Sequence, residues 1–240
     1  MIERKHGRAF DRIRPVNIYP DLFGYSDASV LFEIGETKVL VSVSLQNKVP
    51  PFLKGKKTGW LTAEYAMLPC ATQSRLAREA VLNKRNSRGV EISRLIGRSI
   101  RSVVNLDLIG ERTIVIDCDV LQANGGTRVA CITAAGVVLQ MAVDRWIEKG
   151  ILTESIIKEP VAAISSGIIN GEACVDLDYD EDCTAKADFN FIISRSGRLI
   201  EVQGTAEKEP LDWDEFDALK NLACDGVKEL FEQIKASRSE

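Results

Sequence analysis

The sequence predicts an α+β fold of two pseudo-equivalent halves, roughly residues 10–150 and 158–236, in one domain spanning residues 1–240. Two observations lead to this prediction. Each half contains runs of alternating β-branched and polar residues, paired around short turns as in β-hairpins. In each half a long stretch with apolar residues at helical spacing follows the hairpins. Strands grouped before helices are typical of α+β proteins, and the repetition indicates two related halves.

The first half begins with a predicted hairpin, residues 28–34 and 37–45, around Gly35-Glu36. Two consecutive prolines then end the pattern, and a further strand is predicted over residues 60–67. Residues 92–104 carry one apolar stripe at helical spacing, which predicts an amphipathic helix.

The chain is organised around residues 112–146. Residues 113–121 (TIVIDCDVL) alternate with a period of two, which predicts a strand with Asp117 and Asp119 on one face. After the sequence Asn-Gly-Gly-Thr-Arg, apolar residues recur at helical spacing without proline, so a long buried helix is predicted to begin near Thr127. Strand, glycine turn and helix start are therefore contiguous.

This glycine turn has the features of an anion site. A helix start leaves backbone N–H groups unpaired at the positive end of the helix dipole, and Gly125 and Gly126 let a ligand approach them closely. Thr127 adds a hydroxyl, and Arg128 adds a planar set of donors matched to phosphate oxygens. The turn is neither a Walker loop nor a GxGxxG fingerprint, and an ordinary loop with a helix cap is the alternative interpretation.

The second half repeats the pattern. A terminal helix is predicted to begin at Asp212, with Glu215 as its capping-box partner. Before it, four strands are predicted in two hairpins, residues 161–169 with 173–179 and residues 188–194 with 199–203.

Composition sets outer limits on the class of protein. With 240 residues, 45% of them hydrophobic, the chain can bury a full core. Its charged start has no apolar signal core, and no apolar run suggests a membrane span, so a cytoplasmic protein is expected. The six cysteines form no CxxC pair, which favours reduced thiols over disulfides or zinc ligands.

The only histidine, His6, lies in the polar N-terminal stretch. A Ser-His-Asp or Cys-His site would depend on it alone, and a cluster of imidazole metal ligands is excluded. The remaining chemistries use carboxylates, Arg or Lys, backbone donors, or a metal held by oxygen ligands.

Positive charge is concentrated in residues 75–101, where eight basic residues against two acidic ones give +6 in a chain of net charge −4. Such separation suggests a surface for a polyanion. Three arginines on the outer side of the predicted helix are expected to form a solvated face: Arg94, Arg98 and Arg101. Four others precede the periodic region, where a functional role and a solvated face are equally plausible: Arg75, Arg78, Arg85 and Arg88.

An acidic run lies between the two predicted hairpins of the second half, from Asp176 to Asp188. Its first aspartates match the start of an EF-hand loop, but Glu181 stands where Gly is needed and Ala187 where Glu is needed. A magnesium site made by a few carboxylates, with waters and substrate phosphates, remains open. A plain solvated turn is the default expectation.

Taken together, these segments resemble the bacterial ribonuclease PH family, over nearly the whole chain. The wider family includes polynucleotide phosphorylase and exosome ring subunits. Five segments carry the resemblance: residues 13–16 (IRPV), 59–69 (GWLTAEYAMLP), 91–98 (EISRLIGR), 117–128 (DCDVLQANGGTR) and 201–207 (EVQGTAE).

The resemblance implies a phosphate-dependent 3′-to-5′ exoribonuclease, a phosphorolytic tRNA nucleotidyltransferase that trims the 3′ ends of tRNA precursors and releases nucleoside diphosphates. Inorganic phosphate is the nucleophile, so no side-chain nucleophile is needed. The implied phosphate-binding residues are Arg88, Gly126, Thr127 and Arg128. Arg88 and Arg128 are also implied to be catalytic.

The resemblance further implies a divalent ion, Mg²⁺ or Mn²⁺, held by Asp182 and Asp188, one of which assists as general acid or base. Arg75 and Arg78 match two RNA-binding residues of the family. Cys70 departs from it, because an arginine is typical there, which puts the grip on the tRNA body in question. Asp117 and Asp119 are alternatively structural groups behind the phosphate turn.

The implied partners are tRNA precursors and other RNA 3′ ends, including those of rRNA, with no DNA and no membrane. The implied assembly is a homo-hexamer, a trimer of dimers. Two other classes of function remain as alternatives. One is a catalytically silent RNA-binding ring subunit, which the presence of all the implied ligands argues against. The other is a small-molecule phosphate enzyme, which leaves the +6 segment unexplained.

Overall fold

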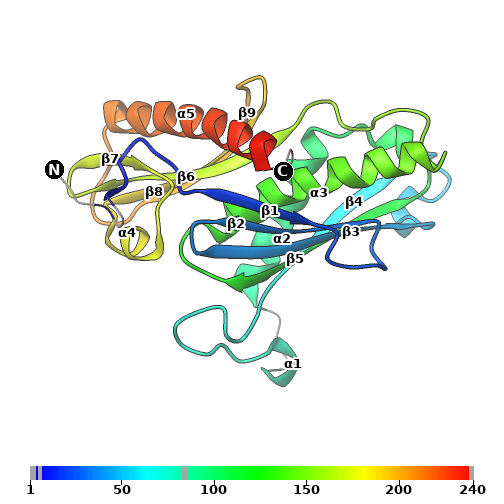
Figure 1. The fold of residues 1–240 in the computed structure, drawn as a ribbon, viewed down its shortest axis with the longest axis horizontal. Coiled ribbons are helices and arrows are strands. Elements are labelled where there is room, and N and C mark those ends of the chain that lie inside the picture. Colours follow the sequence, from blue (N-terminus) through cyan, green and yellow to red (C-terminus); the bar gives the residue numbers. More distant parts are fainter. Residues whose placement is uncertain (1–3, 5–6, 83–85, 238–240) are drawn as a thin grey trace.

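The computed structural model describes residues 4, 7–82 and 86–237. His6, Lys84 and Arg85 lie outside the described residues. Within the described part, the chain forms two β-sheets, one from each half, with helices packed on them (Figure 1). The predicted α+β fold is therefore confirmed.

The sheet of the first half has five strands in the order β1-β2-β3-β5-β4, antiparallel except for the parallel pair β4 and β5. The predicted first hairpin is present, with Ile34 opposite Thr37 at its closed end. The edge strand β1 was not predicted. The strands are β1 (Val16–Pro20), β2 (Ala28–Ile34), β3 (Thr37–Gln46), β4 (Trp60–Met67) and β5 (Thr113–Gln122).

The sheet of the second half has four antiparallel strands in the order β7-β6-β8-β9. A strand over residues 173–179 was predicted, but β7 ends at Val175 because Asp176 takes the left-handed conformation, with φ of +55°. A short helix that was not predicted follows, α4 (Tyr179–Thr184). The strands are β6 (Val161–Ile169), β7 (Glu172–Val175), β8 (Ala187–Ser194) and β9 (Leu199–Ala206).

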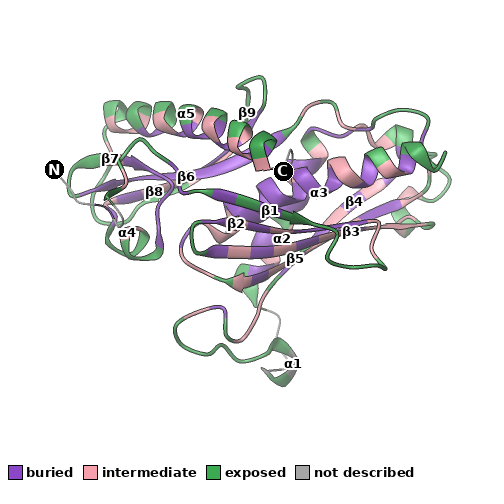
Figure 2. Cartoon of the chain, viewed as in Figure 1, coloured by how far each residue is buried: buried purple, intermediate pink, exposed green. Residues whose placement is uncertain are grey.

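The long helix α3 (Thr127–Glu148) begins where predicted and packs against strands of both sheets, chiefly β3 and β6. By length and composition, it is the one helix in the described part that could cross a membrane, contrary to the expectation that no run approaches a span. However, 67% of the apolar window is buried inside the protein. The helix is apolar nearly all round because it faces core on both sides (Figure 2).

Two further helices complete the packing. The helix α2 (Ser87–Ser102) lies against β4 and α3, and it begins five residues before the predicted helix. The terminal helix α5 (Trp213–Ser237) covers β6 and β7. At its start, the Asp212 N–H donates to the Glu215 carboxylate at 3.0 Å, which is one of the two bonds of the predicted capping box.

The segment between β4 and α2, which carries the short helix α1 (Glu79–Leu82), extends away from both sheets (Figure 1). We call residues 68–78 of this segment the basic arm. Most of the basic arm is exposed (Figure 2), whereas Ala71 is buried and its carbonyl accepts from the Ala123 N–H at 2.8 Å. The arm is thus anchored beside the glycine turn and free at its tip.

The outer face of α2 corrects one prediction. Arg94 is exposed, as predicted, but Arg101 places its guanidinium 4.7 Å from the centre of the Trp60 ring. Arg98 forms two hydrogen bonds of 2.6 Å with the Glu201 carboxylate on β9. Only part of this helix face is therefore a solvated one.

The cysteine thiols are free and divide into two groups. Cys118, Cys131 and Cys174 are buried, as predicted for core thiols. Cys70 and Cys183 are exposed, and Cys224 is half-buried.

Candidate active site

The glycine turn connects β5 to α3 in a conformation that requires its glycines. Gly125 and Gly126 have φ of +75° and +66°, which L-residues rarely adopt. Gly126 is the N-cap of α3 and provides no side-chain cap. Within the described residues, no acceptor meets the N–H groups of Thr127 and Arg128. The start of α3 thus presents free donors at the positive end of a 22-residue helix.

Two side chains from other strands hold this turn. The Thr37 hydroxyl, at the start of β3, donates to the Gly125 carbonyl at 2.7 Å and accepts from the Asn124 N–H at 3.1 Å. The Tyr65 hydroxyl, on β4, lies 3.0 Å from the Thr127 hydroxyl. Burial raises the pKa of Tyr65 and so keeps the phenol neutral, and either of the two hydroxyls can donate to the other.

Arg128 is held from the side of the second half. Its guanidinium donates to the Gln203 side-chain oxygen on β9 at 3.0 Å and lies 3.7 Å from the Glu91 carboxylate on α2. Gln203 in turn donates to Glu201 at 3.1 Å, the same carboxylate that binds Arg98. Arg128 is therefore oriented by a chain of polar groups that crosses between the halves.

Arg88 lies in the first turn of α2, where the Asn86 side chain accepts from its backbone N–H at 3.0 Å. The Arg88 side chain is exposed. Its charge acts on Asp182 and on Tyr65, and the charge of Arg128 acts on the same two groups. The structure thus brings both predicted phosphate-binding arginines to the glycine turn.

Asp182 and Asp188 face this site from the second half. Asp182 lies on α4, and Asp188 is the second residue of β8. Burial raises the pKa of Asp182, against the lowering effect of Arg88 and Arg128. Burial also raises the pKa of Asp188, and the charges of Asp182 and Glu207 raise it further. Two mutually repelling carboxylates therefore lie beside two arginines.

This carboxylate pair fits a divalent cation. No group of three or more metal-ligand side chains is present in the described part of the chain. Mg²⁺ is typically held by one or two carboxylates together with waters and substrate phosphates, so Asp182 and Asp188 are a sufficient protein contribution. In the described residues neither carboxylate forms an ion pair with a Lys or Arg side chain, so both are open to a cation.

The start of the acidic run has a structural role, which corrects the default expectation of a solvated turn. Asp176 is fully buried and its carboxylate binds Arg14. Asp178 is the N-cap of α4 and forms a capping box with Glu181. These side chains already form an ion pair and a helix cap within the protein, so they are not available as EF-hand calcium ligands.

Arg75 and Arg78 lie on the basic arm and line a shallow depression there with Leu68, Pro69 and Cys70. Within the described residues, the side chain of neither arginine makes a hydrogen bond or ion pair, although the Arg78 carbonyl accepts from the Val81 N–H at 3.0 Å. They are therefore separate from the arginines at the glycine turn. Free cations on an exposed arm are the arrangement expected of contacts to an RNA backbone.

Asp117 and Asp119 are not brought to the site. They lie on the face of the first sheet opposite α3, and Asp117 is paired in register with Glu64 on β4. Burial raises the pKa of both groups, and for Asp117 the charges of Glu64 and Asp119 add to it. Their side chains belong to the sheet surface.

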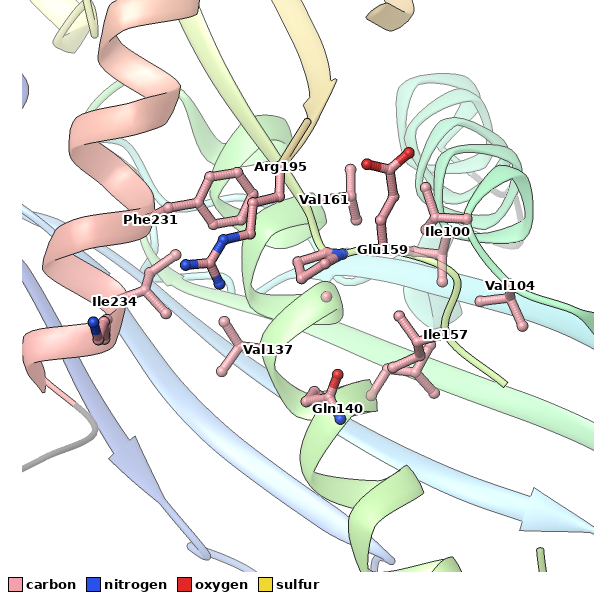
Figure 3. A pocket seen from close by; sticks show the side chains of 15 residues that line it. Ile100, Val104, Val137, Gln140, Ile157, Glu159, Val161, Arg195, Phe231 and Ile234 are labelled. Carbon is pink, nitrogen blue, oxygen red and sulfur yellow. The ribbon is translucent and has the colours of Figure 1, made fainter. Parts of the chain in front are cut away.

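A cavity of about 410 Å³ lies elsewhere, between the end of α2, the middle of α3 and the end of α5 (Figure 3). It is lined mainly by apolar residues, and the Arg195 guanidinium lies over the Phe231 ring at 5.8 Å. None of the predicted site residues lines it. Its charged lining residues, Glu159, Arg195 and Lys235, are not among the predicted site residues, so volume alone does not identify the reactive centre.

The structure adds two residues to the site that were not predicted, Tyr65 and Gln203. Both lie in segments that carry the family resemblance, the GWLTAEYAMLP and EVQGTAE runs. Their sequence positions indicated importance but gave no sign of which ligand they contact. Only the folded arrangement shows that they touch Thr127 and Arg128.

Comparison with known proteins agrees with this geometry. The family model for domain 1 of the 3′ exoribonuclease family matches residues 12–143, and the model for domain 2 matches residues 159–226. The chain belongs to the ribonuclease PH family. Its relatives include the ribonuclease PH of Neisseria meningitidis serogroup B, 50% identical over 225 residues, or 94% of this chain and 93% of the relative. The ribonuclease PH of Neisseria gonorrhoeae strain FA 1090 is 50% identical over 223 residues, or 93% and 92%.

Solved structures share the ribonuclease PH fold. The Archaeoglobus fulgidus exosome with RNA bound to the active site is similar with a TM-score of 0.81 and 20% identity, covering 97% of this chain and 92% of that one. Rice (Oryza sativa) Rrp46 has a TM-score of 0.74 at 16% identity, covering 95% and 97%.

The identity to ribonuclease PH over nearly the whole chain confirms the family resemblance and the predicted activity. The protein is a phosphorolytic 3′ exoribonuclease, a nucleotidyltransferase that acts on RNA. The alternative of a catalytically silent ring subunit is not favoured.

Proposed function

We propose that this ribonuclease PH family member trims the 3′ ends of tRNA precursors and uses the glycine turn as the seat of its nucleophile, inorganic phosphate. One observation carries the assignment of the site. Two arginines and the uncapped start of α3 lie near two carboxylates that form no ion pair with a Lys or Arg among the described residues. The arginines and the helix start can hold an anion, and the two carboxylates beside them can hold a cation.

In this proposal Arg88, Arg128, Thr127 and the N–H groups at Gly126 hold phosphate in line with the terminal phosphodiester. A phosphate oxygen forms a bond to the terminal phosphorus, and the bond from that phosphorus to the 3′ oxygen breaks. The products are a nucleoside diphosphate and an RNA one nucleotide shorter. The arginines stabilise the negative charge that spreads over the transferred phosphoryl group in the transition state.

The 3′ oxygen leaves with a developing negative charge and needs a proton or a cation. Asp182 and Asp188 are suited to both roles, because burial raises the pKa of each carboxylate and their oxygens are hard ligands. A bound Mg²⁺ or Mn²⁺ would supply charge stabilisation at the phosphoryl and leaving oxygens. We propose that these two aspartates hold it, with Tyr65 and Gln203 fixing the groups opposite.

The basic arm is proposed to bind the RNA body through Arg75 and Arg78. Support comes from the lack of side-chain partners of both arginines within the described residues and from the anchoring of the arm at Ala71, beside the glycine turn. Cys70 replaces an arginine that is typical of the family, so the basic arm would make one phosphate contact fewer with RNA than the arm of a typical member.

We further propose a homo-hexamer working in the cytoplasm on tRNA precursors and other RNA 3′ ends, including those of rRNA. Closed symmetric rings are a common solution for subunits of one kind. Two solved structures that share the fold are an exosome with RNA bound to its active site and an archaeal exosome core, and this likeness supports an assembly of several chains.

The deciding experiment incubates the purified protein with a 3′-extended tRNA and Mg²⁺, with and without inorganic phosphate, and identifies the released nucleotides. Nucleoside diphosphates released only with phosphate are the expected result. Release of monophosphates without phosphate would mean hydrolysis and would remove the proposed role of the glycine turn. A tRNA with a mature 3′ end serves as the matched control for substrate preference.

A further inference from the structure

The glycine turn of the first half and the carboxylate helix α4 of the second half meet at one buried arginine, Arg14. Its guanidinium donates to the Asp176 carboxylate at 2.9 and 2.7 Å, and its backbone N–H donates to the same carboxylate at 2.7 Å. The same guanidinium donates to the Asn124 carbonyl at 2.6 Å. Arg14 thus binds both Asn124, which precedes the two glycines, and Asp176, which lies two positions before the N-cap of α4.

The glycine turn and α4 also contact each other directly. The Asn124 side-chain oxygen accepts from the Tyr179 N–H, the first residue of α4, at 3.2 Å. A Cβ on Gly125 would overlap the backbone of Leu177 and Asp178. The two segments are therefore in van der Waals contact, and three residues beyond Tyr179 the helix carries Asp182.

At this junction Asp176 combines full burial of a charged side chain with a left-handed backbone conformation. It is fully buried, and its φ of +55° is in the left-handed region that favours glycine. Its N–H donates to the Ser165 carbonyl at 2.6 Å. Strained residues persist where the surroundings over-determine them, and they cluster at functional sites. This strain directs the chain out of β7 and into α4.

We propose that Arg14 and Asp176 are positioning residues that fix the distance between the glycine turn and Asp182. The inference rests on the proposed function, since it assigns phosphate to the turn and the leaving 3′ oxygen to the carboxylates. Neither residue touches the reacting atoms. Together they set the alignment of two groups that come from different halves of the chain.

The sharpest variant is Arg14→Lys. An ammonium keeps the charge opposite Asp176, but it cannot bind both carboxylate oxygens and the Asn124 carbonyl at once. Thr37 and Tyr65 still hold the turn itself, so phosphate binding is retained. We expect kcat to fall between about 10- and 100-fold, the effect of a misplacement of about 1 Å, while KM for phosphate changes less than about 2-fold.

Arg8→Lys is the matched control. Arg8 also lies against Asp176, with a nitrogen 3.5 Å from its carboxylate, but among the described residues no bond joins it to the glycine turn. Arg8 also donates to Glu181 of α4 at 3.2 Å. We expect this variant to retain kcat within about 3-fold, because it perturbs acidic residues of the same cluster without removing a bond to the glycine turn. Thermal melting of both variants, with assays well below each Tm, separates loss of activity from loss of folding.

Three outcomes decide the inference. A loss of kcat in Arg14→Lys that is absent in Arg8→Lys, with KM for phosphate retained, supports it. Equal activity of folded Arg14→Lys and wild type overturns it, as does a parallel rise in KM, which would make Arg14 part of phosphate binding. If wild type itself releases no nucleoside diphosphates, the proposed function fails first, and the variants are then not the cause.

A second pair of substitutions covers the case in which Arg14→Lys does not fold. Replacing both partners, Arg14→Met with Asp176→Asn, leaves no unpaired buried charge, and Asn tolerates the left-handed conformation. The same selective loss of kcat is expected in this double variant. Full activity in the folded double variant overturns the positioning role.

Discussion

Arg128 has two polar neighbours, and this determines what its loss should do. Because Gln203 and Glu91 hold it beside the turn and away from the basic arm, Arg128→Ala removes a phosphate ligand but no proposed RNA contact. We expect kcat/KM for phosphorolysis to fall by about 10²- to 10³-fold, the effect of removing one donor to a developing charge. Gel-shift affinity for tRNA should stay within about 2-fold. Equal loss of both would contradict this division of roles.

Asp188 provides a test in which activity and stability move in opposite directions. Its folded-state pKa is raised above the ordinary value of 3.8. As pH rises from 3.8 the unfolded chain loses its proton first, so stability falls with rising pH through the folded pKa and stays lowered at pH 7. Asp188→Asn therefore removes an unfavourable charge.

For Asp188→Asn we expect phosphorolysis to fall by about 10²-fold or more, while Tm at pH 7 rises by about 1 to 3 °C, allowing for partial exposure. Melting curves with and without Mg²⁺ check the cation proposal in parallel. Added Mg²⁺ should raise Tm of the wild type and have a smaller effect on the variant. An equal Mg²⁺ response in both would place the cation elsewhere.

Tyr65 tests the positioning of Thr127. Tyr65→Phe keeps the buried ring but removes the hydroxyl 3.0 Å from Thr127. A single hydrogen bond contributes about 0.5 to 1.5 kcal/mol net, so KM for phosphate should rise roughly 2- to 10-fold. Steady-state kinetics with varied phosphate measure this. A fall in kcat with KM unchanged would instead give Tyr65 a role in the transition state.

Among the individual residues of the site, the sequence predicted the charged side chains better than the neutral ones. Arg88, Arg128, Asp182 and Asp188 all converge on the glycine turn, as the resemblance implied. Their functional assignments stay predictions. Tyr65 and Gln203 could not be assigned, because a strand residue gives no sign of what the opposite segment places against it.

The basic arm is the element on which RNA affinity should depend. Arg75→Ala with Arg78→Ala removes two cations that have no partners within the described residues, so the fold should not change. We expect binding of tRNA to weaken for all sequences alike, and the slope of log K against log salt to decrease by about 2 in magnitude. Filter binding at several salt concentrations measures both. A sequence-dependent loss would indicate base contacts instead.

A reverse substitution tests the family departure at Cys70, beside the anchored residue Ala71 of the same arm. Cys70→Arg restores the arginine typical of the family at an exposed position. Tighter tRNA binding with a steeper salt dependence is expected, by about one further phosphate contact. Unchanged affinity would show that position 70 does not reach the RNA.

Among the elements, the sequence predicted the hairpins and long helices because their periodicity extends over many residues. It did not predict β1, α1 and α4, which are short. α4 depends on the burial of Asp176 against Arg14, a tertiary contact that local propensity does not show, so the acidic run read as a solvated turn. The capping box of Asp178 with Glu181 is a local signature that could have indicated the start of this helix.

For the whole molecule, the assembly prediction has a direct measurement. A subunit of 26.5 kDa should sediment as a hexamer of about 159 kDa at micromolar concentration. The proposed RNA contacts and the phosphate site lie on different elements. Dissociation of the hexamer into single subunits should therefore reduce RNA processing more than it changes phosphate binding. A species at monomer mass with full activity would contradict the ring. The prediction of a single domain also stays a prediction.

The bare beginning of α3 has a meaning beyond catalysis. This helix lies between both sheets, and no side chain caps its first turn. If orthophosphate occupies that place, the nucleophile is also the missing cap, and binding it stabilises the folded protein in proportion to its concentration. Phosphate starvation would then act on the enzyme twice, by slowing its reaction and by shortening the lifetime of the protein itself.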